Sequence, residues 1–375
     1  MEDRSTGAVA MKRRVGIMTW HYYSNFGSAL QAYALQEAIK SLGYAIEVIN
    51  YRDELYGKDS DFKRWSRYII SLFSDIVPPK LRTRIAYPFI HFQKRYLVES
   101  KVIYDEAELK RYARKFDVIV FGSDQIWAPN VFKPQYMACF LDYDKVKAIS
   151  YAASIGLDYL PSAASTVYKQ YLSKFSRISV RERKGQELLL RNCSIKSDLV
   201  LDPTFLLSIN QYIQIEKKPS TLPGKYVFCY FLNENNNYQA TVENAARSLG
   251  AEIIGFSRKK EDKGWLKNDC SIGPEMFLWM IHHAEMVFTD SYHGTIFSLM
   301  YHKTFYHFER FEKNDTINQN SRIHQLIDYF NFSQLLINEH SIINGNSFNY
   351  DYREFERLLK DLKTKSYSYL MEALG

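Results

Sequence analysis

Apolar and polar residues alternate along the first half of the chain in a pattern of short strands and amphipathic helices. An apolar run of strand length at 15–19 precedes a segment, 28–42, whose apolar residues recur at helical spacing and which ends at Gly43. A second strand is predicted at 45–50, so the chain opens as a strand-helix-strand unit. The later elements predicted in this half are strands at 116–121, 148–152, 177–180 and 199–204 and a helix at 162–175.

The second half repeats this alternation and closes with a long amphipathic helix. Its order is strand, helix, strand, and then helix, strand, helix, strand. Apolar residues of the closing helix fall on one stripe, which predicts packing against another surface. The predicted ranges are 225–231, 238–249, 251–255, the four elements of 276–308, and 352–374.

These elements predict an α/β fold with two domains. The stretch 208–224 contains proline and glycine and is the predicted linker. It separates an N-terminal domain, 11–207, from a C-terminal domain, 208–349, and the closing helix in 350–375 is expected to pack back on the N-terminal domain. Because ligand loops lie at the carboxyl ends of strands in such sheets, two facing domains imply a cleft between them.

A basic, helical insertion interrupts the alternation at about 56–100. Nine Lys and Arg residues against four Asp and Glu residues give this stretch a charge of about +5, most of the excess of +7 carried by the chain. Such a segment could rest on a bilayer surface or hold a lipid-linked phosphate. The alternative is a solvated helical hairpin that covers one edge of a sheet.

Composition narrows the function classes. A formal charge of +7 favours anionic substrates or a membrane surface but lacks the concentrated basic footprint of a nucleic-acid binder. The four cysteines are scattered without paired spacing, so neither a zinc site nor a disulfide framework is indicated, and no metal is expected. The first apolar run is too short for a signal peptide core or a membrane span, which favours a cytoplasmic protein.

The most informative stretch for chemistry is 284–300. An apolar run ends in Thr-Asp-Ser, and helical spacing follows, which predicts a strand, a tight turn and a helix with His293 in its first turn. Free N–H groups at a helix start attract anions, and an imidazole there can donate a proton. The alternative is that His293 only packs or caps at this joint.

A polar aromatic loop at 20–28 is a second candidate ligand loop, because it follows the first strand. It does not match the glycine-rich dinucleotide fingerprint. The alternative is a loop that only caps the following helix through Ser28 or Asn25.

Six motifs in order along the chain resemble the polysaccharide pyruvyl transferase family. They are NFGSALQAYAL at 25–35, VFGSDQIW at 120–127, ISYAAS at 149–154, SVRE at 179–182, DPTFL at 202–206 and TDSYHG at 289–294. The resemblance implies a glycosyltransferase-B-like pair of Rossmann-type domains.

The resemblance also implies an activity, which is the transfer of pyruvate from phosphoenolpyruvate to two sugar hydroxyls to form a ketal. It implies no metal or cofactor beyond phosphoenolpyruvate as co-substrate. The expected acceptor is a lipid-linked or nucleotide-linked sugar of a surface polysaccharide or exopolysaccharide precursor. The expected place of action is the cytoplasm, with contact to the inner membrane face through the basic insertion.

Site roles follow from matching these motifs to the chemistry. Arg181, supported by Arg183 and by the helix start at Ser291, is expected to bind the anionic donor. His293 is the expected general acid that protonates the methylene carbon of the donor. Asp124 is expected to serve the acceptor hydroxyls. The other expected substrate contacts are Asn25, Gly27, Ser28, Gln125, Trp127 as a sugar platform, Tyr292, Gly294 and Thr295.

One position departs from the family pattern. Many members carry Arg two residues before this histidine, where this chain has Ser291. Either another cation, such as Lys303, Arg183 or Arg310, replaces it, or the donor differs. The rival functions are therefore a nucleotide-sugar glycosyltransferase of the same architecture and a non-catalytic glycan-pathway binding protein.

Two of the assigned residues also have structural interpretations. Arg181 could pair structurally with Glu182 or Asp202, and Asp124 could be a helix or turn cap.

Overall fold

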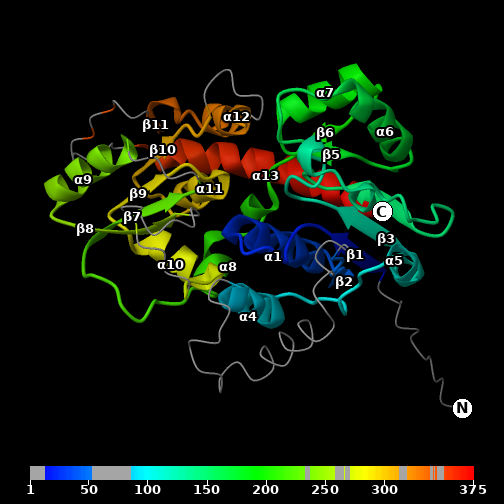
Figure 1. Ribbon diagram of the computed structural model, residues 1–375, viewed down its shortest axis with the longest axis horizontal. Helices are drawn as coiled ribbons and strands as arrows, with labels where there is room; N and C mark the ends of the chain where they lie inside the picture. The colour runs from blue at the N-terminus through cyan, green and yellow to red at the C-terminus, as the bar shows by residue number, and fades with distance from the viewer. Residues whose placement is uncertain are drawn as a thin grey trace, which may run out of the picture.

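Two α/β units lie side by side in the structure, a computed structural model of the 375-residue chain (Figure 1). The residues it describes are 13–52, 86–232, 237–257, 266, 271–311, 319–337, 341, 343 and 350–375. Most of the predicted basic insertion therefore lies outside the described residues, and its described end forms a helix, α4 (Ala86–Tyr96).

The N-terminal unit is built on a parallel sheet with the strand order β2-β1-β3-β4. A short parallel pair, β5 and β6, continues it, because residues 149 and 153 near β4 bridge to residues 177 and 180 around β5. The strands are β1 (Arg14–Met18), β2 (Ala45–Val48), β3 (Val118–Phe121), β4 (Lys147–Ser150), β5 (Ser179–Val180) and β6 (Asp198–Leu199). The helices are α1 (Phe26–Ser41), α4, α5 (Glu106–Ala113), α6 (Ser162–Leu172) and α7 (Arg183–Cys193), with short 3-10 turns at Pro129–Val131, Pro134–Met137 and Pro203–Phe205.

The C-terminal unit has a parallel sheet with the order β11-β10-β9-β7-β8. Its strands are β7 (Tyr226–Phe231), β8 (Glu252–Ser257), β9 (Met286–Thr289), β10 (Phe305–Phe308) and β11 (Leu336–Ile337). Its helices are α8 (Ile209–Ile213), α9 (Asn237–Leu249), α10 (Pro274–His283), α11 (Tyr292–Met300) and α12 (Ser321–Tyr329), with a 3-10 turn at Ser333–Leu335. Two parallel α/β sheets confirm the predicted fold class.

Strand order explains where ligand loops must lie. In the N-terminal sheet the chain leaves β1 for β2 on one side and returns to β3 on the other, and in the C-terminal sheet β7 and β9 have the same relation. Where the strand order reverses in this way, the two neighbouring loops diverge and leave a crevice at the carboxyl ends of the strands. The loop after β1, the loop after β3 and the turn after β9 are the three segments that carry most of the predicted site residues.

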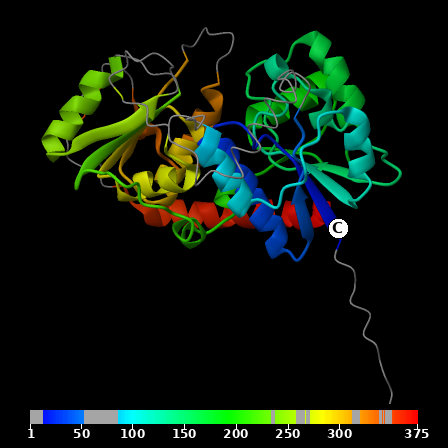
Figure 2. The same ribbon diagram turned by 60° about the horizontal axis from the view of Figure 1, so that its bottom comes forward.

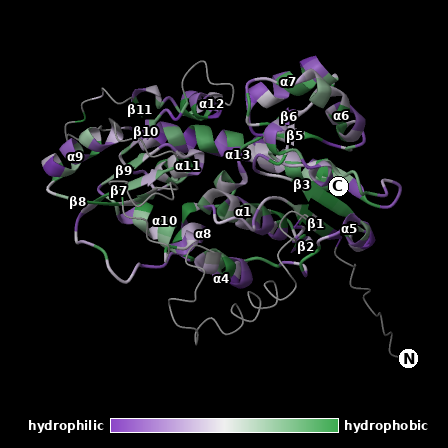
Figure 3. Ribbon diagram, viewed as in Figure 1, coloured by the Kyte–Doolittle hydropathy of each residue, from purple (hydrophilic) through white to green (hydrophobic). Residues whose placement is uncertain are grey.

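An aromatic core joins the two units. Phe26, the first residue of α1, stacks on Phe277 of α10 with ring centroids 4.5 Å apart and nearly parallel planes, and it also contacts Tyr230 and Phe256. The buried face of α1 belongs to the same cluster as the core of the C-terminal sheet. Figure 3 shows apolar residues along the strands and polar stretches on outer helices such as α7.

The closing helix, α13 (Tyr352–Leu374), runs beneath both units (Figure 2). Its first half buries Phe355 in the cluster of the C-terminal unit. Its second half buries Leu370 and Leu374 among residues of β1 and β3, and the hydroxyl of Tyr369 donates to the carbonyl of Ser150 at 2.8 Å. None of the described helices is long and apolar enough to cross a membrane.

Candidate active site

Asp202 is the centre of a buried polar network. Its Oδ2 lies 2.8 Å from Nη1 of Arg181 and 3.5 Å from Nε2 of His293. Its Oδ1 accepts hydrogen bonds from the backbone N–H and the hydroxyl of Thr204 at 3.0 and 2.7 Å. Burial alone would raise the pKa of Asp202, but His293, Arg181 and the Thr204 N–H hold that pKa well below its usual range. Asp202 is therefore a fixed negative charge beside the imidazole.

Arg181 is buried among carboxylates, with its side chain 1% exposed. Besides Asp202, Asp124 Oδ1 lies 3.6 Å from its guanidinium and Glu182 Oε2 lies 3.7 Å away. Burial would lower the pKa of Arg181, but Asp202, the Tyr292 ring and the other two carboxylates raise it above its usual value. Asp202 and Glu182 are the structural partners that the sequence analysis named as the alternative to donor binding. The three carboxylates hold the Arg181 guanidinium in place.

His293 meets the N-terminal unit directly at Gly27. A Cβ atom built on Gly27 would lie 2.1 Å from Nδ1 of His293, so only glycine fits against this ring. The turn before α11 is fixed by Ser291, whose Oγ accepts the N–H of Gly294 at 3.3 Å as the helix N-cap. A Cβ on Gly294 would meet Thr289 Oγ1 at 2.4 Å, so α11 packs closely on the end of β9.

The imidazole of His293 retains a nitrogen for chemistry. Its Nε2 is buried and has no hydrogen-bond partner among the described residues. The 3.5 Å separation from Asp202 is longer than an ordinary hydrogen bond of this type. The unpaired nitrogen is therefore the one that faces the Asp202 carboxylate, and the other ring nitrogen lies against Gly27.

Asp124 lies at the carboxyl end of β3 with a left-handed backbone, φ 69°. Its Oδ2 accepts a hydrogen bond from the Ser28 hydroxyl at 2.5 Å, and its Oδ1 accepts the N–H of Gln125 at 2.8 Å. Asn25 caps α1 by accepting the N–H of Ser28 at 3.1 Å. A non-glycine residue held in this conformation is unusual and is found disproportionately at functional sites.

A pocket of about 690 Å³ opens beside Asp124. It is lined by polar groups of the loop after β1 and the loop after β3, and by the aromatic rings of Trp20, Tyr23 and Phe132. The Trp20 and Tyr23 rings meet edge to face at 5.8 Å between centroids. The other lining residues are Asn25, Ser28, Gln125, Pro129, Asn130, Val131 and Lys133. A polar floor with aromatic walls suits a sugar ring.

Two predicted substrate contacts are wrong. Trp127 is fully buried and donates its indole N–H to the carbonyl of Tyr136 at 3.0 Å, so it cannot be a sugar platform. Thr295 is also fully buried, and its hydroxyl donates to the carbonyl of Ser291 and contacts Nδ1 of His307 at 2.8 Å. Both positions follow an apolar or small residue that faces the core. The motif alone does not show whether the next side chain faces the core or the ligand.

Arg322 is the site residue that the sequence did not indicate. It lies in the first turn of α12 and is buried, and its guanidinium carbon is 5.7 Å from the centre of the Tyr292 ring. The same ring lies 4.7 Å from the guanidinium carbon of Arg181 and 5.3 Å from the imidazole of His293.

The surroundings of Arg322 balance its charge only in part, through Glu182. Burial, and then the neighbouring Arg181, lower the pKa of Arg322 to about 10. Its Nε has no hydrogen-bond partner among the described residues. A buried guanidinium with an unused donor and a depressed pKa is a place where an anionic ligand would be stabilised.

Gln319 links this cation to the N-terminal unit. Its side-chain oxygen accepts hydrogen bonds from Gln125 at 3.0 Å, Arg310 at 3.3 Å and Arg322 at 2.5 Å. The Gln319 amide thus links the loop after β3 to α12.

The cations proposed to replace the missing arginine near Ser291 lie in different places. Lys303 donates to a backbone carbonyl of α10 at 3.0 Å. Arg183 is exposed at the start of α7, over an aromatic ring of α12 at 5.9 Å. Arg310 contacts Gln319. Arg322 therefore places a charge beside Tyr292 from another part of the chain, which the spacing of the motif could not reveal.

Comparison with known proteins identifies the family of the chain. The sequence profile described as polysaccharide pyruvyl transferase matches residues 25–310, most of the chain. The chain belongs to the polysaccharide pyruvyl transferase family. The match begins at the N-cap of α1 and covers the loop after β3, the end of β5, Asp202 and the turn before α11. No curated protein sequence matches this family member.

Several solved structures are similar to this pyruvyl transferase family member. They are the UDP-GlcNAc 2-epimerase from Methanocaldococcus jannaschii (TM-score 0.46, 12% identity, 94% of this chain and 100% of that one), the glycosyltransferase SnogD from Streptomyces nogalater (0.42, 11%, 96% and 95%) and the E. coli ADP-heptose lps heptosyltransferase II (0.39, 10%, 94% and 99%). At these scores the family assignment rests on the sequence match alone.

Proposed function

We propose that the protein transfers pyruvate from phosphoenolpyruvate to two hydroxyls of a sugar in a surface-polysaccharide precursor, forming a cyclic ketal. The observation that carries the proposal is the juxtaposition of His293 with the buried Arg322 across the Tyr292 ring. Phosphoenolpyruvate brings a phosphate and a carboxylate, for which a guanidinium is the fitting partner. It also brings an enol whose methylene carbon needs a proton donor.

The donor half of the reaction needs an acid. In this scheme His293 gives its proton to the methylene carbon of phosphoenolpyruvate, which becomes a methyl group and leaves an oxocarbenium-like centre at C2. Asp202 faces the imidazole throughout, and Arg322 with the N–H groups at the start of α11 balances the charge of the phosphate and carboxylate.

The acceptor half needs a base and a binding surface. The first sugar hydroxyl adds to C2 and loses its proton, the C2–O bond to phosphate breaks, and the second hydroxyl closes the ketal. Of the two hydroxyl protons, one replaces the proton given by His293 and one leaves with phosphate. Asp124, which borders the pocket between Trp20 and Tyr23, is the proposed base.

The proposed partners follow from this scheme. They are phosphoenolpyruvate as co-substrate, no further cofactor, and a lipid-linked or nucleotide-linked sugar as acceptor. The proposed place of action is the cytoplasm, where both substrates would be present, with the basic insertion near the inner membrane face. That insertion lies outside the described residues except for α4.

The direct test is to incubate the protein with phosphoenolpyruvate and a panel of diols from glycan precursors. We expect release of inorganic phosphate in equal amount to a pyruvate mass gain in the acceptor, with the methyl signal of a ketal by NMR. Calorimetry with nucleotide diphosphate sugars is run in parallel. Tight binding of a nucleotide sugar together with no phosphate release would replace the proposal by a glycosyltransferase.

Replacing Arg322 by glutamine is expected to weaken phosphoenolpyruvate binding by tenfold to a hundredfold. A charge-assisted hydrogen bond contributes about 1.5–3 kcal/mol, and each 1.4 kcal/mol corresponds to a factor of ten in affinity. The fold should survive, because the burial of this cation is unfavourable in the free protein.

The measurement for this variant is calorimetry with phosphoenolpyruvate. Arg357→Gln is the matched control, since that guanidinium is exposed in an ion pair with Glu354 on α13, and the affinity of this variant should stay within about twofold of the unmodified protein. Equal affinities of Arg322→Gln and the unmodified protein would remove Arg322 from the donor site.

A further inference from the structure

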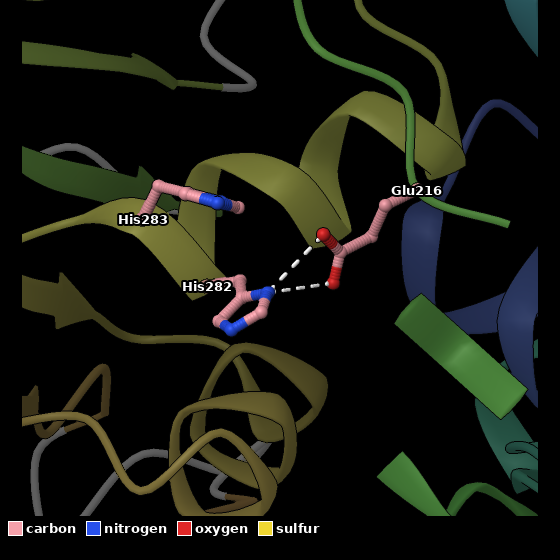
Figure 4. A group of neighbouring side chains, drawn as sticks. All are labelled: Glu216, His282 and His283. Atoms are coloured by element: carbon pink, nitrogen blue, oxygen red, sulfur yellow. Dashed lines mark hydrogen bonds and ion pairs between the residues drawn. The ribbon is translucent and has the colours of Figure 1, made fainter. Parts of the chain in front are cut away.

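A second cluster of ligating side chains lies at the other end of α11. Glu216, on the segment that leads from α8 into β7, faces the last two residues of α10, His282 and His283 (Figure 4). None of the three belongs to the network around Asp202. The cluster lies beside Tyr301, which follows α11 directly, whereas His293 is at the first turn of that helix.

His282 and Glu216 already have the spacing of two ligands on one metal ion, and His283 lies close to both. Nδ1 of His282 lies 3.0 and 3.2 Å from the two oxygens of Glu216. One potential ligand atom from each of the three residues lies within 4.8 Å of the others. A tetrahedral zinc ion lies about 2.0–2.2 Å from each ligand atom, so two of its ligand atoms are a little over 3 Å apart. The distances between His282 and Glu216 are close to that value. Figure 4 shows both imidazoles extending toward the side on which Glu216 lies.

The neighbours of the cluster orient each ligand. The hydroxyl of Tyr301 donates to Glu216 Oε1 at 2.6 Å, and the Tyr301 ring stacks on His282 with centroids 4.6 Å apart. Nδ1 of His283 pairs with the carbonyl of Trp279 at 3.0 Å, and the two rings stack at 3.7 Å. That pairing fixes Nδ1 of His283 as the protonated nitrogen and leaves Nε2 with a free lone pair, the arrangement found around metal-binding histidines.

We propose that Glu216, His282 and His283 bind one divalent cation of the zinc type. Two imidazoles and one carboxylate are a common donor set for Zn²⁺, with water in the fourth position. His283 is exposed, so the ion can enter from solvent, while Glu216 has a side chain only 4% exposed and anchors it from below. The carbonyl end of α10 adds a negative helix dipole at this position.

A described cation, Lys303, contacts the backbone of this cluster. Its ammonium donates to the carbonyl of His282 at 3.0 Å.

The bound ion would have a structural effect. It would join three segments that are separate in sequence, namely the chain entering the C-terminal sheet, the end of α10 and, through Tyr301, the end of α11. Binding to the folded state alone raises stability by mass action. The inference does not depend on the proposed transferase reaction, because the ion takes no part in it.

The experiment uses the full chain after removal of metals with a chelator. Titration with ZnCl₂ by calorimetry is expected to give one bound ion per chain, and the melting temperature should rise with added zinc. His283→Gln should lower the affinity at least tenfold without loss of fold, because this side chain is exposed. Glu216→Gln should lower it as well.

The matched control is His302→Gln. His302 is also a partly exposed histidine paired with a glutamate, Glu356, at 2.7 Å, but the described residues around it offer no third ligand. Zinc affinity of this variant should equal that of the unmodified protein. Absence of stoichiometric zinc binding, or equal binding by His283→Gln and the unmodified protein, would overturn the proposal. A visible absorption band of tetrahedral Co²⁺ that is lost in His283→Gln would support it.

Discussion

Replacing His293 by glutamine is expected to lower kcat of the proposed pyruvyl transfer by a factor of about 10²–10⁴, the usual contribution of a positioned general acid. Glutamine fills similar space and retains a donor, but it cannot give up a proton at neutral pH. The imidazole has one ring nitrogen without a hydrogen-bond partner among the described residues, and a carboxylate 3.5 Å from it. The measurement is the rate of phosphate release at saturating phosphoenolpyruvate and acceptor.

A second variant tests the same role without touching the histidine. Gly27→Ala puts a methyl group where the Nδ1 atom of His293 now lies, so the ring must move and kcat should fall at least tenfold. Gly224→Ala is the matched control, since a Cβ there meets no atom within 4 Å and should leave kcat unchanged. If His293→Gln retains more than a tenth of kcat, another group supplies the proton.

Replacing Arg181 by methionine is expected to cost about 3–5 kcal/mol of unfolding free energy, because it leaves buried carboxylates without their cation. From the sequence we expected Arg181 to bind the anionic donor. The contacts with Asp202, Asp124 and Glu182 change that expectation, and loss of activity in such a variant would report lost structure first.

The pH dependence of stability tests whether Arg181 stabilises the fold through Asp202. The folded-state pKa of Asp202 lies below its unfolded value, so its contribution is present at neutral pH and is lost as the pH falls from about 4 toward the depressed value. In Arg181→Met that folded-state pKa rises, so the loss of stability on acidification should be shallower than in the unmodified protein.

The measurement for Arg181→Met is urea unfolding between pH 7 and pH 3. Arg353→Met, at an exposed ion pair, is the matched control and should leave the urea midpoint close to that of the unmodified protein. A midpoint for Arg181→Met equal to that of this control would show that the carboxylates do not need their cation.

Periodicity predicted the elements that combine a clear apolar pattern with a clear stop signal. The strand at β7 and the closing helix α13 were placed within a residue of their bounds. Helices α7 and α12 were not predicted, because each begins in a run of polar and charged residues and buries only one narrow face. The predicted linker 208–224 holds α8 and buries Tyr212, since a proline-rich stretch can still pack on a neighbouring core.

The site residues divide in the same way into those with a local sequence signal and those placed only by the tertiary fold. The motif around His293 and the glycine at 27 could be read from sequence, because helix starts and glycine positions have local signatures. The role of Arg322 could not, since α12 brings it to Tyr292 from 30 residues further along the chain. The prediction for Trp127 was wrong although its motif is local. An aromatic residue after a ligand loop packs into the core as readily as it faces a sugar.

The stacking of Phe26 on Phe277 has a consequence for how substrates are admitted. Phe26 follows Asn25 directly and precedes Gly27, so the rim of the acceptor pocket and the contact with His293 are anchored in the core of the other unit. A large apolar junction of this kind does not hinge open the way a polar interdomain contact does. The separation between this pocket and His293, the proposed proton donor, is thus set before any substrate binds, so that little conformational freedom remains to be lost on binding.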